Sequence, residues 1–212
     1  MTKPIQLKDI IKPMTIGIIG PTQIDKFCKI INMDKQEYIN KIKRLAKALV
    51  NTEIILVTNK GSSCELFAQE YKKNKGKKLK VLVPQNDKEF GIDYLNTEIA
   101  DEIVNCGTWR NQPEELCEQS TQFICLGLSQ GTMIEVLFTK WFKVDAIYMF
   151  NELQSKELPE ELIKDLNIFQ SNFEDFMKIF ESQENKLFES TDSSLIFKDK
   201  KLGQAFLNLG KK

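Results

Sequence analysis

Residues 123–135 read Phe-Ile-Cys-Leu-Gly-Leu-Ser-Gln-Gly-Thr-Met-Ile-Glu, and this stretch decides the fold class. Its first four residues, 123–126, are apolar without alternation, which is typical of a strand buried on both faces of a parallel sheet. Gly127 ends the run. Apolar residues then recur at the three- and four-residue spacing of an amphipathic helix: Ile134, Leu137, Phe138 and Trp141. We therefore expect a strand, a tight loop and a helix N-terminus, a junction at which α/β sheets bind ligands and at which phosphate is readily held.

Strands and helices alternate on both sides of this junction. Further strands are expected at 15–20, where Gly20-Pro21 closes the strand, and at 54–57, 79–83, 146–150 and 168–169. Further helices are expected at 38–49, 64–71, 113–119 and 173–180, the first of them opened by Asp34 with Glu37 at capping-box spacing. Residues 22–33 are interpreted as a connection, and 85–109 as an irregular segment with a strand or short helix near Ile103. The alternation predicts an α/β, Rossmann-like, doubly wound and mostly parallel sheet with helices on both faces.

The length and composition fit one domain with an appendage. A chain of 212 residues that is 42% hydrophobic can bury one good core. We assign residues 1–182 to a Rossmann-like nucleotide-binding domain. Residues 183–212 are polar with two apolar segments, and we expect a tail that is partly disordered or docked on the domain or a partner subunit.

The charged residues and cysteines exclude several classes of protein. Lys+Arg and Asp+Glu number 30 each, which argues against a nucleic-acid binder because such proteins concentrate positive charge on one face. The five cysteines are scattered, so a disulfide framework and a zinc site are both disfavoured and a reducing cytoplasm fits best. No leader and no apolar run near eighteen residues is present, so we expect no membrane span.

The absence of histidine narrows the possible chemistry further. With no histidine in the sequence, histidine-dependent nucleophile systems, histidine metal sites and histidine general bases are all excluded. Catalysis would have to use carboxylates, Arg, Lys, Tyr, Cys or backbone donors. We expect neither a metal nor a cofactor.

Thr132 and Glu135 allow two interpretations. Thr-x-x-Glu at a helix start is the sequence of a capping box, with Thr132 as N-cap and Glu135 at the third helical position. Alternatively, a carboxylate in the first turn is kept ionised by the helix dipole and can stabilise a cationic transition state, while the N–H groups of Gly131 and Thr132 face an anion. The pattern alone leaves both open.

The loop Gly127-Leu-Ser-Gln-Gly-Thr-Met-Ile-Glu135, with Arg110-Asn111 upstream, resembles the Lonely Guy-like family and its wider SLOG superfamily, whose members were formerly called lysine decarboxylases. The family loop reads Gly-Gly-x-Gly-Thr-x-x-Glu, of which Gly131, Thr132 and Glu135 match the second half. Residues 57–65 also resemble an earlier glycine-rich turn that ends in Glu. The chain departs from the family where Leu128-Ser129 replaces two glycines, and a leucine there could close the phosphate cradle.

The resemblance implies a function and a site. It implies a homodimer that binds an AMP-like nucleoside 5′-monophosphate and hydrolyses the N-glycosidic bond to release base and ribose 5-phosphate. Arg110 and Glu135 would be the catalytic pair. The candidate ligand-binding residues, from the resemblance and from the turns at strand ends, are Gly20, Pro21, Lys60, Gly61, Ser62, Trp109, Ser129, Gln130, Gly131 and Thr132. For Arg110, an ion pair with Glu114 or Glu115 is the structural alternative.

Two functions of different class therefore stand side by side. The first is hydrolysis of a purine nucleotide. The alternative is a non-catalytic SLOG-type module that binds or senses a nucleotide-derived ligand, because the lost glycines fit a site that binds without turnover.

Overall fold

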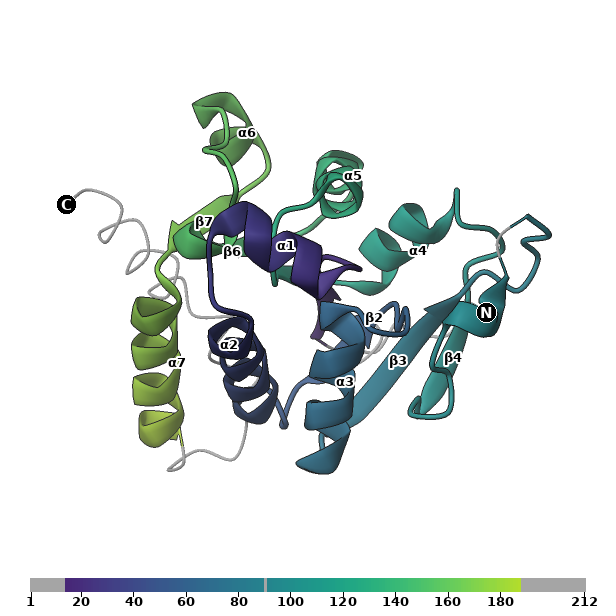
Figure 1. Ribbon diagram of the computed structural model, residues 1–212, viewed down its shortest axis with the longest axis horizontal. Coiled ribbons are helices and arrows are strands. Elements are labelled where there is room, and N and C mark those ends of the chain that lie inside the picture. Colours follow the sequence, from purple (N-terminus) through teal and green to yellow (C-terminus); the bar gives the residue numbers. More distant parts are fainter. Residues whose placement is uncertain (1–13, 90, 188–212) are drawn as a thin grey trace, which may run out of the picture.

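The computed structural model describes residues 14–89 and 91–187 (Figure 1). Its centre is a sheet of seven parallel strands in the order β4-β3-β2-β1-β5-β6-β7. The strands are β1 (Thr15–Ile19), β2 (Glu53–Leu56), β3 (Lys78–Val83), β4 (Glu102–Asn105), β5 (Gln122–Cys125), β6 (Ala146–Phe150) and β7 (Ile168–Ser171). The α/β, doubly wound, Rossmann-like fold is thereby confirmed.

Helices connect successive strands, as expected for parallel pairs, except between β3 and β4, where only a short 3-10 turn lies. They are α1 (Ile24–Ile31), α2 (Lys35–Ala48), α3 (Ser63–Lys73), α4 (Gln112–Gln119), α5 (Gln130–Phe138), α6 (Glu160–Asp165) and α7 (Phe173–Leu187), with short 3-10 turns η2 (Ile92–Tyr94), η3 (Thr139–Trp141) and η4 (Asn151–Leu153). Helix α7 continues past residue 182, and most of the proposed tail, 188–212, lies outside the described residues.

Helix α1 corrects the interpretation of residues 22–33 as a plain connection. Phe27 and Cys28 on this helix are buried, and Ile24 and Ile31 pack against the core. These residues recur at three- and four-residue spacing, so one face of the segment is apolar and folds as a helix against the sheet.

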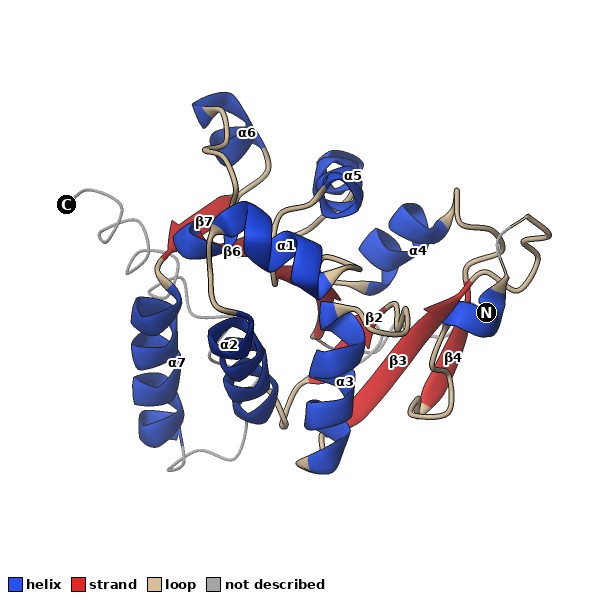
Figure 2. Cartoon of the chain, in the orientation of Figure 1, coloured by secondary structure: helices blue, strands red, loops and turns tan. Residues whose placement is uncertain are grey.

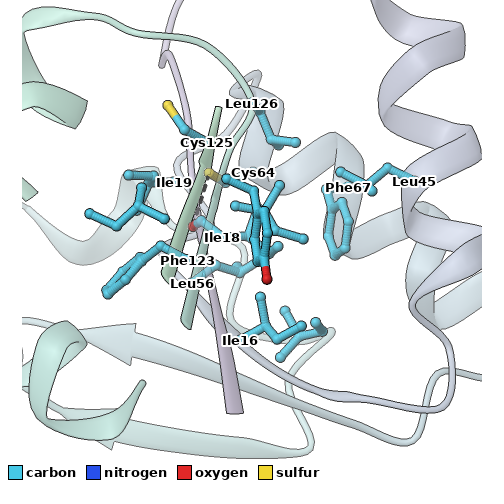
Figure 3. Packing of buried hydrophobic residues seen from close by; sticks show 14 of the residues in the cluster. Ile16, Ile18, Ile19, Leu45, Leu56, Cys64, Phe67, Phe123, Cys125 and Leu126 are labelled. Carbon is cyan, nitrogen blue, oxygen red and sulfur yellow. Dashed lines mark hydrogen bonds between the residues drawn. The ribbon is translucent and has the colours of Figure 1, made fainter. Parts of the chain in front are cut away.

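Two layers of helices enclose the sheet (Figures 1 and 2). Helices α7, α2 and α3 lie next to one another on one side, with α2 in contact with both α3 and α7, while α4 and α5 contact each other on the other side. All residues of β1, β5 and β6 are buried, in agreement with the unbroken apolar runs in their sequences. Figure 3 shows Ile16, Ile18 and Phe123 of this core between the layers.

The end of β5 is fixed by contacts from two distant helices. The Tyr38 hydroxyl of α2 donates a buried hydrogen bond of 2.9 Å to the Leu126 carbonyl oxygen. Phe27 of α1 lies against Gly127 so closely that a Cβ at Gly127 would come within 2.4 Å of the Phe27 ring. Glycine is therefore required at position 127, because any larger residue would collide with the Phe27 ring.

All five cysteines are buried and unpaired: Cys28, Cys64, Cys106, Cys117 and Cys125. Burial raises the pKa of each thiol above its usual value, so the thiols stay protonated at neutral pH. No helix within 14–89 and 91–187 has the length and apolar character that a membrane crossing requires.

Candidate functional site

The sheet reverses its direction of growth between β1 and β5. From β1 the chain adds β2, β3 and β4 on one side and then returns to place β5 on the other. In α/β sheets this switch point opens a crevice at the carboxyl ends of the two strands, where ligands bind. A pocket of ≈ 380 Å³ lies there, lined by residues that follow β1, β2, β4 and β5. Its volume lies within the range of small-molecule sites.

Helix α5 supplies one wall of this pocket, and its N-cap is Ser129. The Ser129 hydroxyl accepts from the Thr132 N–H, and the Thr132 hydroxyl accepts from the Ser129 N–H, which makes a reciprocal capping box. The predicted box of Thr132 with Glu135 is therefore wrong. The N-cap of α5 is Ser129 and not Thr132, because the hydroxyls of Ser129 and Thr132 each accept a hydrogen bond from the backbone N–H of the other residue.

The cap leaves two amide donors at the start of α5. The first four N–H groups of a helix, counted from the N-cap, have no partner within it, and here those of Ser129 and Thr132 each donate to the other residue's hydroxyl. The N–H groups of Gln130 and Gly131 remain. A Cβ built on Gly131 would meet no atom within 4 Å, so the space beside it is open. Leu128 does not fill that space, because its side chain is 9% exposed and belongs to the core.

Glu135 lies on the inner side of α5 and lines the pocket. It is the sixth residue of the helix, so the expectation of a first-turn carboxylate held ionised by the dipole is wrong. Gln112 of α4, which is buried, donates from Nε2 to Glu135 Oε1 at 2.9 Å. Burial raises the pKa of Glu135 to about 7, against a smaller opposing effect of the Gln112 hydrogen bond. Near neutral pH the carboxyl group is thus present in both forms.

Arg110 and Trp109 reach the same pocket from the loop between β4 and α4. Trp109 is half-buried and packs against the core, and its backbone N–H donates to Asp87 Oδ2 at 3.1 Å. Arg110 is exposed, and within the described part of the chain it forms no ion pair with a carboxylate, including Glu114 and Glu115. Its guanidinium is available to an anionic ligand.

The structure brings most of the predicted residues together and separates some of them. The pocket lining includes Gly20, Ser62, Trp109, Arg110, Ser129, Gly131, Thr132 and Glu135. It does not include Pro21, Lys60, Gly61 or Gln130. Pro21 is buried, and its carbonyl accepts from Ser63. Lys60 and Gly61 line a neighbouring groove, and Gln130 is exposed at the start of α5, next to the lining residues Ser129 and Gly131.

The earlier turn, 57–65, is held together by Glu65. One carboxylate oxygen of Glu65 accepts from the Gly61 N–H at 2.6 Å, and the other accepts from the Asn96 side chain at 2.9 Å. The Ser62 hydroxyl caps α3 by accepting from the Glu65 N–H. The side chains of Ser62 and Glu65 thus stabilise the turn through hydrogen bonds within it and to Asn96.

The sequence reasoning missed several lining residues: Ile18, Thr22, Val57, Asn59, Cys64, Gln112, Pro113, Ile134 and Phe138. Gln112 is the most consequential of them because it touches Glu135. Proline favours the first turn of a helix, and Gln112 directly precedes Pro113. The sequence therefore contained a signal that Gln112 lies at the start of α4. Within the described residues no group of three or more His, Cys, Asp or Glu side chains is arranged to hold a metal ion.

Solved structures with the same fold are known. The molybdenum cofactor binding protein of the phototrophic bacterium Rippkaea orientalis superposes with a TM-score of 0.58 at 16% identity, over 81% of this chain and 98% of that one. The molybdenum cofactor carrier protein of Chlamydomonas reinhardtii gives 0.58 at 12% identity, over 80% and 97%. The structural-genomics target TM1055 gives 0.51 at 16% identity, over 80% and 99%.

The chain has the fold of the Lonely Guy-like and SLOG proteins. The resemblance seen at the loop of residues 127–135 is confirmed at this level, since these neighbours have that Rossmann-like fold. No protein-family model and no curated protein matches the chain by sequence. The likeness of this chain to the three structures concerns the fold.

Proposed function

We propose that the pocket at the β1–β5 switch point binds a small monophosphate ester of a flat heteroaromatic compound. Nucleoside 5′-monophosphates and pterin monophosphates such as the molybdenum cofactor share this chemistry. The phosphate would lie at the N–H groups of Gln130 and Gly131 with Arg110 beside it, and the ring system against Trp109.

One observation carries the proposal. The start of α5, with an amide donor at Gly131 and that of Gln130 next to it in the chain, and the loop that carries Trp109 and Arg110 come from two distant parts of the chain and meet at one pocket. Amides at a helix N-terminus favour anions, and an arginine fork matches phosphate oxygens. The open space at Gly131 lets a phosphate approach the backbone closely. The named functions of the first two structural neighbours, binding and carrying the molybdenum cofactor, support binding as the coarser function.

Titration calorimetry and thermal shift test binding. The ligands are AMP, GMP, inorganic phosphate and purified molybdenum cofactor, whose separate titrations distinguish the nucleotide from the pterin. We expect one of the esters to stabilise the fold, and Gly131→Ala and Arg110→Ala to weaken its binding at least tenfold. Arg44→Ala, which removes the chain's only other arginine, is the matched control. Absence of stabilisation by every ligand contradicts the proposal.

Hydrolysis of the N-glycosidic bond is a second candidate function, favoured by Glu135. Water would form the new bond to the anomeric carbon while the bond to the base breaks, its electron pair leaving with the base, which takes up a proton. The ionised Glu135 carboxylate would offset the positive charge that builds on the ribose in the transition state. Because the pKa of Glu135 is about 7, activity would rise with pH through neutrality.

Release of adenine and ribose 5-phosphate from AMP tests this candidate. We expect turnover in the wild-type protein, and a loss of at least a hundredfold in Glu135→Gln with binding of AMP retained. Glu114→Gln, an exposed carboxylate on α4, serves as control. Binding without turnover, or equal turnover in the wild type and Glu135→Gln, contradicts hydrolysis and leaves the binding function.

The homodimer implied by the resemblance remains a prediction. Its candidate surface is the exposed apolar side of α5 and η3, where Leu137 and Trp141 are 39% and 72% exposed and Ile134, at the rim of the pocket, is 53% exposed. Two-fold dimers are the commonest homo-oligomers, and exposed apolar faces of this kind mark interfaces. Analytical ultracentrifugation of the wild type and of Trp141→Lys tests it: a dimer that the substitution dissociates supports this surface, and a wild-type monomer contradicts it.

A further inference from the structure

A second concave site, the lysine groove, lies next to the pocket. We define it by Lys26 and Lys29 of α1, Lys35 at the start of α2, and Lys60 in the turn after β2, with Asp25 as its acidic residue. Its volume is ≈ 680 Å³. In a chain with equal numbers of acidic and basic residues, four lysines from three separate segments face one aspartate here.

The charge of the groove is only partly neutralised within the protein. Lys35 forms an ion pair of 2.6 Å with Asp25, which uses the single carboxylate. Lys26 and Lys29 are exposed and form no ion pair in the described part of the chain. The Lys60 ammonium donates to the Asp93 backbone carbonyl at 2.7 Å. This contact holds the ammonium group in place, and because a carbonyl carries no net charge it does not neutralise the lysine. Three positive charges therefore remain, which repel one another and attract an anion.

The groove and the pocket adjoin. Thr22, in the loop after β1, lines both of them, and the consecutive residues Gly61 and Ser62 line the groove and the pocket respectively. Gly61 has φ of 79°, and a Cβ on it would meet nothing within 4 Å, so the space beside this residue is open. A ligand in the pocket that is longer than a monophosphate would extend toward the groove at this point.

We infer that the lysine groove binds further phosphate groups of the ligand held in the pocket, so that the preferred ligand is a nucleoside di- or triphosphate. The inference rests on the proposed binding function and deepens it. The pocket alone accounts for one phosphate, at Gln130 and Gly131. The groove supplies cations for the next, and an ammonium group on a flexible stem suits a phosphate as a point charge.

Calorimetric titration with AMP, ADP and ATP at fixed ionic strength tests the inference on the full chain. The variant is the double substitution Lys26→Ala/Lys29→Ala. The control is Lys140→Ala/Lys143→Ala, an exposed pair at the same three-residue spacing outside the groove. We expect the wild type to bind ADP at least tenfold more tightly than AMP. The double variant should lose this gain and keep its affinity for AMP, while the control keeps both.

The outcomes separate the inference from the proposed function. If AMP binds and ADP binds no more tightly, or if the gain persists in the double variant, the inference fails and the proposed function stands. If ADP binds through the lysines and AMP does not bind at all, the groove is supported and the monophosphate assignment fails. If no nucleotide binds, the inference fails. The titration with purified molybdenum cofactor then decides whether the proposed binding function stands. Binding of ADP should also weaken more steeply with salt than binding of AMP, because more charges are paired.

Discussion

The Glu135 carboxyl group makes the stability of this protein depend on pH in a calculable way. Its pKa is raised to about 7 in the folded chain from an ordinary value of 4.5, because burial disfavours the charged form. An acid with a raised folded pKa contributes its full stability below the unfolded pKa and loses it as pH rises toward the folded one. The loss therefore falls between about pH 4.5 and pH 7. Integrated over that window, it amounts to at most about 3 kcal/mol.

Glu135→Gln should remove this dependence. The amide has nearly the same shape, can still accept from Gln112 through its oxygen, and carries no charge to desolvate. We expect the variant to match the wild type near pH 4.5 and to exceed its free energy of unfolding by up to about 3 kcal/mol at pH 8. For a chain of this size each kcal/mol corresponds to roughly 2–4 °C in Tm.

Urea denaturation of both proteins at several pH values measures the effect. Other groups also titrate, so the difference between the two proteins is the informative quantity, and Glu114→Gln reports on an exposed carboxylate of α4. Parallel curves for the wild type and Glu135→Gln across this pH range would refute the argument that burial outweighs the Gln112 hydrogen bond and raises the pKa of Glu135. A variant that is less stable at pH 8 would show instead that the ionised form is stabilised by a partner in solution.

Three further predictions concern packing, capping and surface charge. Gly127→Ala should destabilise the fold by about 1–3 kcal/mol in urea titration, because the new methyl group meets the buried Phe27 ring; an unchanged midpoint would contradict this contact. Asp34→Ala removes the N-cap of α2 and should cost about 1 kcal/mol in the same titration, with Asp34→Asn largely restoring it. Arg44→Ala breaks partly exposed contacts of α2 with Glu181 of α7 and should cost less than about 1 kcal/mol, an effect that high salt should remove.

The sheet could be predicted because its signals are local. Unbroken apolar runs such as 123–126 are long enough to identify buried strands, and a glycine or proline often ends them, as Gly127 does here. Asp34 is recognisable as an N-cap from its side chain and position, and it accepts from the N–H groups of Gln36 and Glu37. Such features need only a few neighbouring residues.

The site was only partly predictable because it depends on contacts between distant segments. The contact between Gln112 and Glu135 joins α4 to α5, and neither sequence position indicates it. The spacing of Ile134, Leu137 and Trp141 predicted a helix correctly, although the residues that α5 buries are Thr132 and Val136. Periodicity identifies a helix with an apolar side. Which side of α5 faces the core depends on the path of the loop between β5 and α5, and the periodicity does not contain that information.

The five buried, unpaired cysteines provide an internal set of reporters for opening of the fold. They lie in α1, α3 and α4, in β5, and directly after β4, so each sulfur samples a separate part of the molecule. An alkylating reagent modifies such a thiol only when its surroundings separate, and the order of modification maps the local opening equilibria. Because Cys64 also lines the pocket, its alkylation should slow selectively when a ligand occupies the site, which would give an occupancy assay without any introduced label.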